Sequence, residues 1–254
     1  KRHILIRVRF RKRLFIGLML RGLPENGKNR KNQISINSKR VIYLETKGYC
    51  RWDENSELNI RYHDEEWGIP LHDDRGQFEF LMMEVMQCGL NWTMMINKRE
   101  IFRSCFDNFD YSRIAEYNDT DIERIMNTEG MIRSRRKIEA IIHNAKCFLK
   151  IQEEFGSFDA YLWGYSENKT ILYNKHNDGY IPVSNGLSDK ISRDLKKRGF
   201  KYLGTITVYS HLQACGIIND HDKNCPCCQK IVSSYPTVQK RRYLEKNVRY
   251  YGES

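Results

Sequence analysis

The sequence predicts an all-α domain between residues 47 and 228. In the segment 134–154, apolar residues recur at helical spacing and form one face of a helix. These residues are Ile138, Ile141, Ile142, Ala145 and Phe148. Signals for β-strands are few, and the short candidate Thr170–Tyr173 lies inside a polar stretch (164–185) that is typical of a loop.

Several other segments carry the helical pattern. The predicted helices are 56–66, 74–88, 98–107, 111–116, 119–128, 134–154, 157–163, 186–198 and 203–218. Short polar side chains near their starts can accept hydrogen bonds from the first backbone N–H groups of a helix. The expected N-caps are Asp73 or Asp74, Ser112, Asp119 and Ser188.

The net charge of +11 belongs to the ends of the chain. Residues 1–46 hold 13 Lys/Arg against 2 Asp/Glu, and residues 229–254 hold 6 against 2. Residues 47–228 hold 24 against 28, so this part is acidic overall. We therefore predict a basic, flexible N-terminal extension (1–46), the helical domain (47–228) and a basic C-terminal tail (229–254). Any nucleic-acid binding by the domain has to rest on local basic clusters.

The 8 cysteines are scattered along the chain and do not form the dense framework of a small disulfide scaffold. This usage predicts reduced thiols and a cytoplasmic location, with some of the cysteines acting as metal ligands. No apolar run approaches the roughly 20 residues needed to span a bilayer, so we expect no membrane partner.

Cysteines and histidines near the two ends of the domain predict a metal site. Twelve residues separate Cys50 from His63, and His221 lies four residues before Cys225. Two thiolates and two imidazoles suit a tetrahedral zinc ion. Four protein ligands would leave no position for water, so this zinc would be structural and would clip the start of the domain to its end.

Other interpretations of these residues remain open. Cys50 could be a small core residue, and His221 could cap a helix. Cys227 and Cys228 compete with Cys225 as ligands.

Glu84 lies in an unusually apolar segment, 80–92. Together with Gln87 and Asn91 it follows the i, i+3, i+7 spacing of a polar stripe on one helix face. A carboxylate in such surroundings is rarely buried without a partner or a task. Glu84 could therefore be the floor of a pocket, or the stripe could be the exposed side of a two-sided helix.

Aromatic residues lie close to Glu84 in the sequence. Trp52, Tyr62 and Trp92 could form a cage, whereas Trp67 is expected in the core. An aromatic cage with a carboxylate would hold a flat cationic heterocycle through cation–π attraction and charge-assisted hydrogen bonds.

The segment 130–138 separates two predicted helices. Gly130 can close the first helix, and the second then opens with free backbone N–H groups beside basic side chains, which makes an anion site. A helix-hairpin-helix that binds a DNA phosphate has this layout, and a solvated basic turn is the alternative. The candidate DNA-binding residues are Arg133, Arg135, Arg136 and Lys137.

With these motifs in place, the chain from about Gly48 to Cys228 closely resembles the bacterial DNA-3-methyladenine glycosylase I family. The likeness is carried, in order, by Cys50-Arg51-Trp52, Tyr62 to Gly68, Gly89-Leu90-Asn91-Trp92, Gly130 to Ile138, Lys196 to Lys201 and Gln213 to His221. The resemblance implies a helix-hairpin-helix DNA glycosylase fold with a structural zinc clip. The chain departs from the family pattern at Val85, Met86, Cys88, Asn91 and Arg136.

The resemblance also implies roles for the site residues. The family's zinc ligands fall on Cys50, His63, His221 and Cys225, its base-contacting carboxylate on Glu84, and its pocket aromatics on Trp52, Tyr62 and Trp92. The expected reaction is hydrolysis of the N-glycosidic bond of N3-methyladenine in alkylated double-stranded DNA. It would proceed after the base is flipped out of the stack and would leave an abasic site.

We expect a monomer. No lysine is placed for a Schiff base, so we also expect no lyase activity. The alternative is a zinc-stabilised protein that binds damaged or distorted DNA without catalysis.

Overall fold

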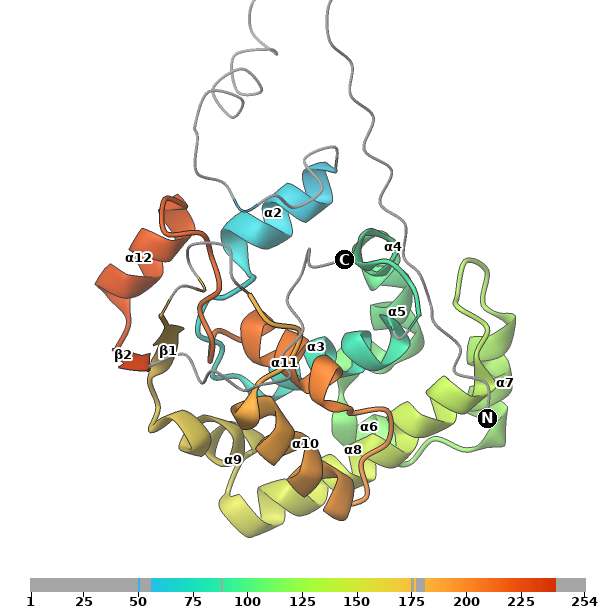
Figure 1. Ribbon diagram of the computed structural model, residues 1–254. Helices are drawn as coiled ribbons and strands as arrows, with labels where there is room; N and C mark the ends of the chain where they lie inside the picture. Colours follow the sequence, from blue (N-terminus) through green and yellow to red (C-terminus); the bar gives the residue numbers. More distant parts are fainter. Residues whose placement is uncertain (1–49, 51–55, 88, 175, 177–180, 241–254) are drawn as a thin grey trace, which may run out of the picture. The chain divides into compact units, whose positions relative to one another are not determined.

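The computed structural model describes residues 50, 56–87, 89–174, 176 and 181–240 (Figure 1). The predicted N-terminal extension (1–46), Trp52 and the last residues of the predicted tail lie outside this part. The described helices are α2 (Glu57–Glu65), α3 (Asp74–Gln87), α4 (Trp92–Asn97), α5 (Arg99–Cys105), α6 (Tyr111–Ala115), α7 (Asp119–Asn127), α8 (Arg135–Phe155), α9 (Phe158–Trp163), α10 (Gly186–Lys197), α11 (Thr205–Ala214) and α12 (Pro226–Ser234). The prediction of a mostly helical domain is confirmed.

Two short strands accompany the helices in the described part. The predicted strand β1 (Thr170–Tyr173) pairs in parallel with β2 (Thr237–Lys240), with Thr170 opposite Thr237. Neither β2 nor α12 was predicted, and the expected domain boundary at 228 falls inside α12. The chain therefore continues in regular structure through the first part of the predicted tail.

Capping side chains set the starts of several helices. Asp73 caps α3 as predicted, because its Oδ2 accepts a hydrogen bond from the backbone N–H of Gly76 (2.7 Å). The other expected caps are wrong by one to three residues, and the observed caps are Asp110, Asn118 and Asn185. Ser188 is instead the third residue of α10, and its hydroxyl accepts from the N–H of Asn185 in a capping box.

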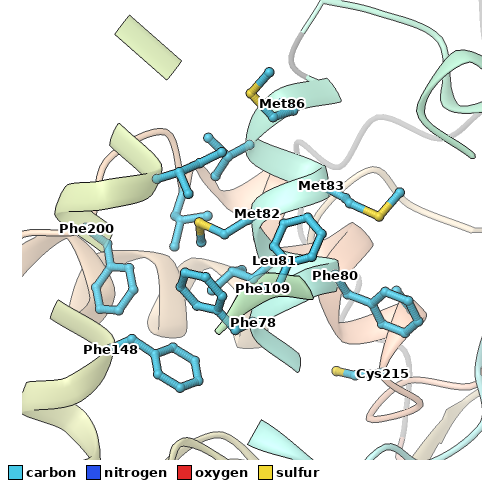
Figure 2. Close-up of a cluster of buried hydrophobic side chains, with 14 of the residues drawn as sticks. Phe78, Phe80, Leu81, Met82, Met83, Met86, Phe109, Phe148, Phe200 and Cys215 are labelled. Carbon is cyan, nitrogen blue, oxygen red and sulfur yellow. The ribbon is translucent and has the colours of Figure 1, made fainter. Parts of the chain in front are cut away.

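Helix α3 runs through the core. Every residue from Gln77 to Met86 is buried, because α4, α8, α9 and α11 all pack against this helix. Figure 2 shows the apolar side chains of α3 spreading to different sides of the helix, with Phe109, Phe148 and Phe200 around them. A helix covered on all sides has no solvent face. A polar residue in this stretch is therefore an interior residue.

A close contact between backbones joins the segment after α2 to the turn after α11. Gly216 has a φ of +78°, and a Cβ there would lie 2.6 Å from the backbone atoms of Ile69 and Pro70. The backbone N–H of Leu71 donates to the carbonyl of Cys215 (3.1 Å). Two motifs that are far apart in the sequence, 62–68 and 213–221, therefore lie side by side. None of the described helices has both the length and the apolar character needed to cross a membrane.

Candidate functional site

Four side chains from the two ends of the domain converge on one point. They are Cys50, His63 on α2, His221 and Cys225. His63 Nε2 lies 3.2 Å from His221 Nδ1, and the sulfur–nitrogen distances within the group are 3.4, 3.6 and 3.8 Å. Tetrahedral ligands bound at about 2.0–2.3 Å are separated from one another by about 3.3–3.8 Å. The group therefore has the spacing and the donor atoms to hold one metal ion.

Neighbouring groups orient both imidazoles toward the centre of this cluster. His63 Nδ1 is 2.8 Å from Asp64 Oδ1, and His221 Nε2 donates to the backbone carbonyl of Trp67 (2.9 Å). These bonds leave Nε2 of His63 and Nδ1 of His221 as the acceptors, which is the outer-shell arrangement typical of metal-binding histidines. The backbone N–H of Asp222 donates to the Cys50 sulfur (3.1 Å).

The neighbouring cysteines lie outside the four-residue group. The Cys227 sulfur is 3.9 Å from Asp64 Oδ1, and the Cys228 sulfur accepts a hydrogen bond from Asn219 Nδ2 (3.7 Å). Hydrogen bonds from Cys227 and Cys50 hold the pKa of the Cys225 thiol well below its usual range. Of the three clustered cysteines, Cys225 is thus the one that the fold presents with His63 and His221.

Trp67 and Gly68 complete the walls of the cluster. Trp67 is buried, as predicted, and its ring lies 4.5 Å from that of His221. Gly68 has a φ of +79°, and a Cβ at this position would approach His221 Nε2 to 2.8 Å. The chain can therefore turn directly beneath the imidazole only where there is no side chain.

A second group of residues gathers on the neighbouring face of α2. The Tyr62 ring lies 5.3 Å from the Trp92 ring on α4 and 6.0 Å from the Phe80 ring on α3. Burial raises the pKa of Tyr62 well above its usual value, and the charge of Glu84 raises it further. Tyr62, Trp92 and Glu84 thus come together from three helices, whereas Trp52 lies outside the described residues.

Glu84 is an interior carboxyl group. It is 6% exposed, and burial raises its pKa to about 8. The alternative that Glu84 lies on an exposed helix face is therefore wrong. The predicted polar stripe of Glu84, Gln87 and Asn91 on one helix is also wrong. Helix α3 ends at Gln87, and Asn91 begins the next helix, where its Oδ1 accepts from the N–H of Met94 (2.9 Å). Gly89, at a φ of +86°, lies in the turn between the two helices.

The hairpin between α7 and α8 turns at Gly130, which has a φ of +76°. Arg133 and Arg136 are exposed, and neither makes an ion pair within the part of the chain that the structure describes. The Ser134 side chain makes no capping bond to the N-terminus of α8. The two arginines therefore present positive charge to solvent beside the N-terminus of α8.

The other two basic residues of the hairpin bind protein groups. Arg135 pairs with Glu123 on α7 and lies 3.9 Å from Glu139 on α8. The Lys137 ammonium donates to the carbonyl of Met86 (2.7 Å), close to the C-terminal end of α3. A cation is favourable at that end of a helix. These contacts indicate that Arg135 and Lys137 hold the hairpin in place, which weakens the prediction that they contact DNA.

Comparison with known proteins decides the family. A family model described as methyladenine glycosylase matches residues 52–229. The chain belongs to the methyladenine glycosylase family. DNA-3-methyladenine glycosylase 1 of Escherichia coli (strain K12) is 40% identical over 179 residues, which cover 70% of this chain and 95% of that protein.

Solved structures agree with this family assignment. A crystal structure of 3-methyladenine DNA glycosylase I has a TM-score of 0.66 at 42% identity, and the match covers 70% of this chain and 98% of that one. A variant of 3-methyladenine DNA glycosylase I in complex with 3-methyladenine has a TM-score of 0.64 at 34% identity, with 68% and 92% covered. Strand β2 lies beyond the segment that matches the methyladenine glycosylase family.

Asn59, a buried polar residue close to the aromatic pair Tyr62 and Trp92, was not predicted from the sequence of this methyladenine glycosylase family member. Asn59 on α2 is 2% exposed, and its Nδ2 donates to Thr93 Oγ1 on α4 (2.8 Å). It lies three residues before Tyr62 and so shares a helix face with it. That spacing was the available signal for placing Asn59 near the aromatic group.

Proposed function

We propose that this protein is a DNA repair glycosylase that hydrolyses the N-glycosidic bond of N3-methyladenine in alkylated double-stranded DNA. The reaction would release the free base and leave an abasic site. The observation that carries the proposal is the buried carboxyl group of Glu84 near Tyr62, whose ring packs against that of Trp92, in a member of the methyladenine glycosylase family. A relative with the same fold is known in complex with 3-methyladenine.

For this reaction the protein has mainly to recognise the alkylated base, and acid catalysis is less important. Alkylation at N3 puts positive charge on the base, so its glycosidic bond is already weak. The base has to leave the stack before the protein can surround it. Aromatic faces then hold the cationic ring, and a carboxylate opposes its charge. Water completes hydrolysis at the sugar carbon, through an oxocarbenium-like state.

Glu84 fits the part of the base-binding carboxylate. Its pKa of about 8 leaves most of the carboxyl protonated near neutral pH in the free protein. A cationic base beside it favours the ionised form. Arrival of the damaged base should therefore release a proton and strengthen the attraction at the same time. We assign Glu84 to base recognition and electrostatic stabilisation.

We also propose that the metal of the four-residue cluster is zinc. Two thiolates and two imidazoles at tetrahedral spacing suit this ion, and four protein ligands make the site structural. When bound, the ion would supply a crosslink between the two ends of the domain. Because His63 follows Tyr62 directly on α2, this crosslink would also fix the base-binding face of that helix.

The test of the proposed function uses DNA that has been treated with a methylating agent. Purified protein should release 3-methyladenine, identified by chromatography, and strand breaks should appear only after alkali or an added lyase. A variant lacking the Glu84 carboxylate provides the control for contaminating activity. Tight binding to methylated DNA without release of any base would favour the alternative, a non-catalytic protein that binds damaged DNA.

We further propose that α7, the turn at Gly130 and α8 form a helix-hairpin-helix that binds a DNA phosphate. Because Arg133 and Arg136 are exposed and make no ion pair among the described residues, they are the best placed to contact the DNA backbone. Arg133→Ala should weaken DNA binding and reduce the slope of log affinity against log salt by about 0.9, the value for one phosphate. The slope can be measured by fluorescence anisotropy across a salt series.

Arg135→Ala is the matched control for this experiment. It removes the same charge from the same hairpin, but the charge is one already paired with Glu123. Its salt slope should stay close to that of the parent. A large change in the slope for Arg135→Ala, together with none for Arg133→Ala, would reverse the assignment.

A further inference from the structure

The contact between α2 and α4 contains a buried acceptor without a partner. The Asn59 side chain is 2% exposed, and its Nδ2 donates to Thr93 Oγ1 (2.8 Å). Its Oδ1 is buried and has no hydrogen-bond partner in the described part of the molecule. Buried polar atoms in native proteins are nearly always hydrogen-bonded, so an orphan beside a binding site points to a ligand.

A buried donor without a partner lies on the same pair of helices. Trp92 precedes Thr93 on α4, and its Nε1 likewise makes no hydrogen bond with any described residue. The Trp92 ring is 5.3 Å from Tyr62, which follows Asn59 on α2 by three residues. One unsatisfied acceptor and one unsatisfied donor therefore flank Tyr62.

On the major-groove edge, adenine matches this pair of polarities and guanine does not. In the major groove, adenine presents an amino donor beside a ring-nitrogen acceptor, whereas guanine carries a carbonyl acceptor where adenine has the amino group. An amide oxygen would accept a hydrogen bond from the amino group. The same oxygen facing a carbonyl would meet a second acceptor and gain no bond.

We propose that Asn59 is a specificity-determining residue, whose Oδ1 accepts a hydrogen bond from the exocyclic amino group of the flipped adenine. Thr93 is then a positioning residue, because its hydroxyl holds the amide nitrogen and so directs the oxygen the other way. The amino group has two N–H donors, enough for both Asn59 and Glu84. This inference rests on the proposed function, since it names what selects the base in that same site.

The test compares two free bases that differ at the amino group. The probes are 3-methyladenine and 3-methylhypoxanthine, which has a carbonyl in place of the amino group, and binding is measured by calorimetry. The parent should prefer 3-methyladenine. Asn59→Leu keeps a similar side-chain shape and removes the acceptor. It should lose about 5- to 10-fold in 3-methyladenine affinity, as expected for one neutral hydrogen bond, with little change for 3-methylhypoxanthine.

The ratio of the two affinities separates a specificity role from a structural one. Thr93→Val removes the hydroxyl that orients the amide and should lower the same ratio. It provides an independent test if Asn59→Leu folds poorly. Leu58→Ala changes an exposed neighbour on α2 and should leave the ratio unchanged. In methylated DNA, Asn59→Leu should raise the release of 3-methylguanine relative to 3-methyladenine.

Two different failures can be told apart. If the parent excises 3-methyladenine and the Asn59→Leu ratio equals that of the parent, or both affinities fall together, the role of Asn59 is overturned while the proposed function stands. If the parent neither binds 3-methyladenine nor releases it from DNA, the proposed function fails, and the inference about Asn59 fails with it.

Discussion

Cys225→Ser is expected to release the metal ion and to lower the melting temperature by about 10–20 °C. The ion would close a loop of more than 150 residues, since 162 positions separate His63 from Cys225. A covalent crosslink over a loop of this size contributes roughly 4–5 kcal/mol in the chain-entropy description. For a domain of this size, about 1 kcal/mol corresponds to about 2–4 °C. Metal content by mass spectrometry and thermal unfolding by circular dichroism are the measurements.

Cys227→Ser is the control for this prediction. Its sulfur lies near Asp64 and outside the four-residue group, so the variant should keep one metal ion per chain and most of its stability. If Cys227→Ser lost the metal and Cys225→Ser kept it, the ligand assignment would move to Cys227. Because α2 carries both Tyr62 and His63, loss of the metal should also reduce excision.

Much of the helical fold could be predicted because long helices carry their own signals. Helix α8 spans 21 residues and carries a buried, mostly apolar face from Ile138 to Ile151, and Gly156 follows its end. Helix α4 has only six residues, too few for a periodic pattern, and it was missed. Strand β2 was missed because its partner lies more than sixty residues earlier in the sequence. No local pattern reports such a pairing.

In the candidate site, the sequence indicated which residues take part but not where their side chains point. Residue type and spacing pointed to Cys50, His63, His221 and Cys225, but they left Cys227 and Cys228 as competing ligands, and the family resemblance was needed to choose among them. Residue type could not show that the Lys137 ammonium turns to the carbonyl of Met86. The sequence identifies the basic residues, but only the tertiary structure determines which group each one contacts.

The prediction of a polar stripe on one helix was wrong for a related reason. The spacing of Glu84, Gln87 and Asn91 is helical, but the chain turns at Gly89 and begins a new helix at Trp92. The predicted helix 74–88 already ended before Gly89, so the stripe was extended to Asn91 beyond the end of its own helix. Glu84 is nevertheless buried, as its apolar neighbours in the sequence suggested, because the residues around it on α3 are buried too.

Glu84→Gln is expected to reduce recognition of the alkylated base by one to two powers of ten. The substitution keeps the shape of the side chain and removes its charge, and a hydrogen bond to a charged group contributes roughly 1.5–3 kcal/mol. Inhibition by free 3-methyladenine and single-turnover excision from methylated DNA are the two measurements. Both should weaken in the variant, while the fold and the metal content stay as they are in the parent.

The pH dependence makes the Glu84 prediction more specific. Burial raises the pKa of Glu84 to about 8, so the carboxylate population of the free protein grows as pH rises from about 6 to 9. Excision by the parent at low substrate concentration should rise over the same range, and the Glu84→Gln profile should lack this rise.

The stability of the folded protein should change with pH in the opposite direction. The folded-state pKa lies above the unfolded value of 4.5, so the contribution of this group to stability falls as pH rises from about 4.5 to about 8 and levels off above that. The variant should lose less stability over this range.

Glu79→Gln supplies the contrast on the same helix. Glu79 is also nearly buried on α3, but its carboxylate is bound by Arg99 and Arg103. Arg99 also pairs with Glu66 and Arg103 with Glu100, so each arginine would lose one of two carboxylate partners. Glu79→Gln should therefore lose stability and keep its affinity for 3-methyladenine. Glu84→Gln should lose affinity for 3-methyladenine. Because burial disfavours the ionised carboxyl group of Glu84, the variant should also lose less stability than the parent at high pH. Unchanged base affinity and excision in a folded Glu84→Gln variant would remove Glu84 from the site and leave recognition to the aromatic residues and Asn59.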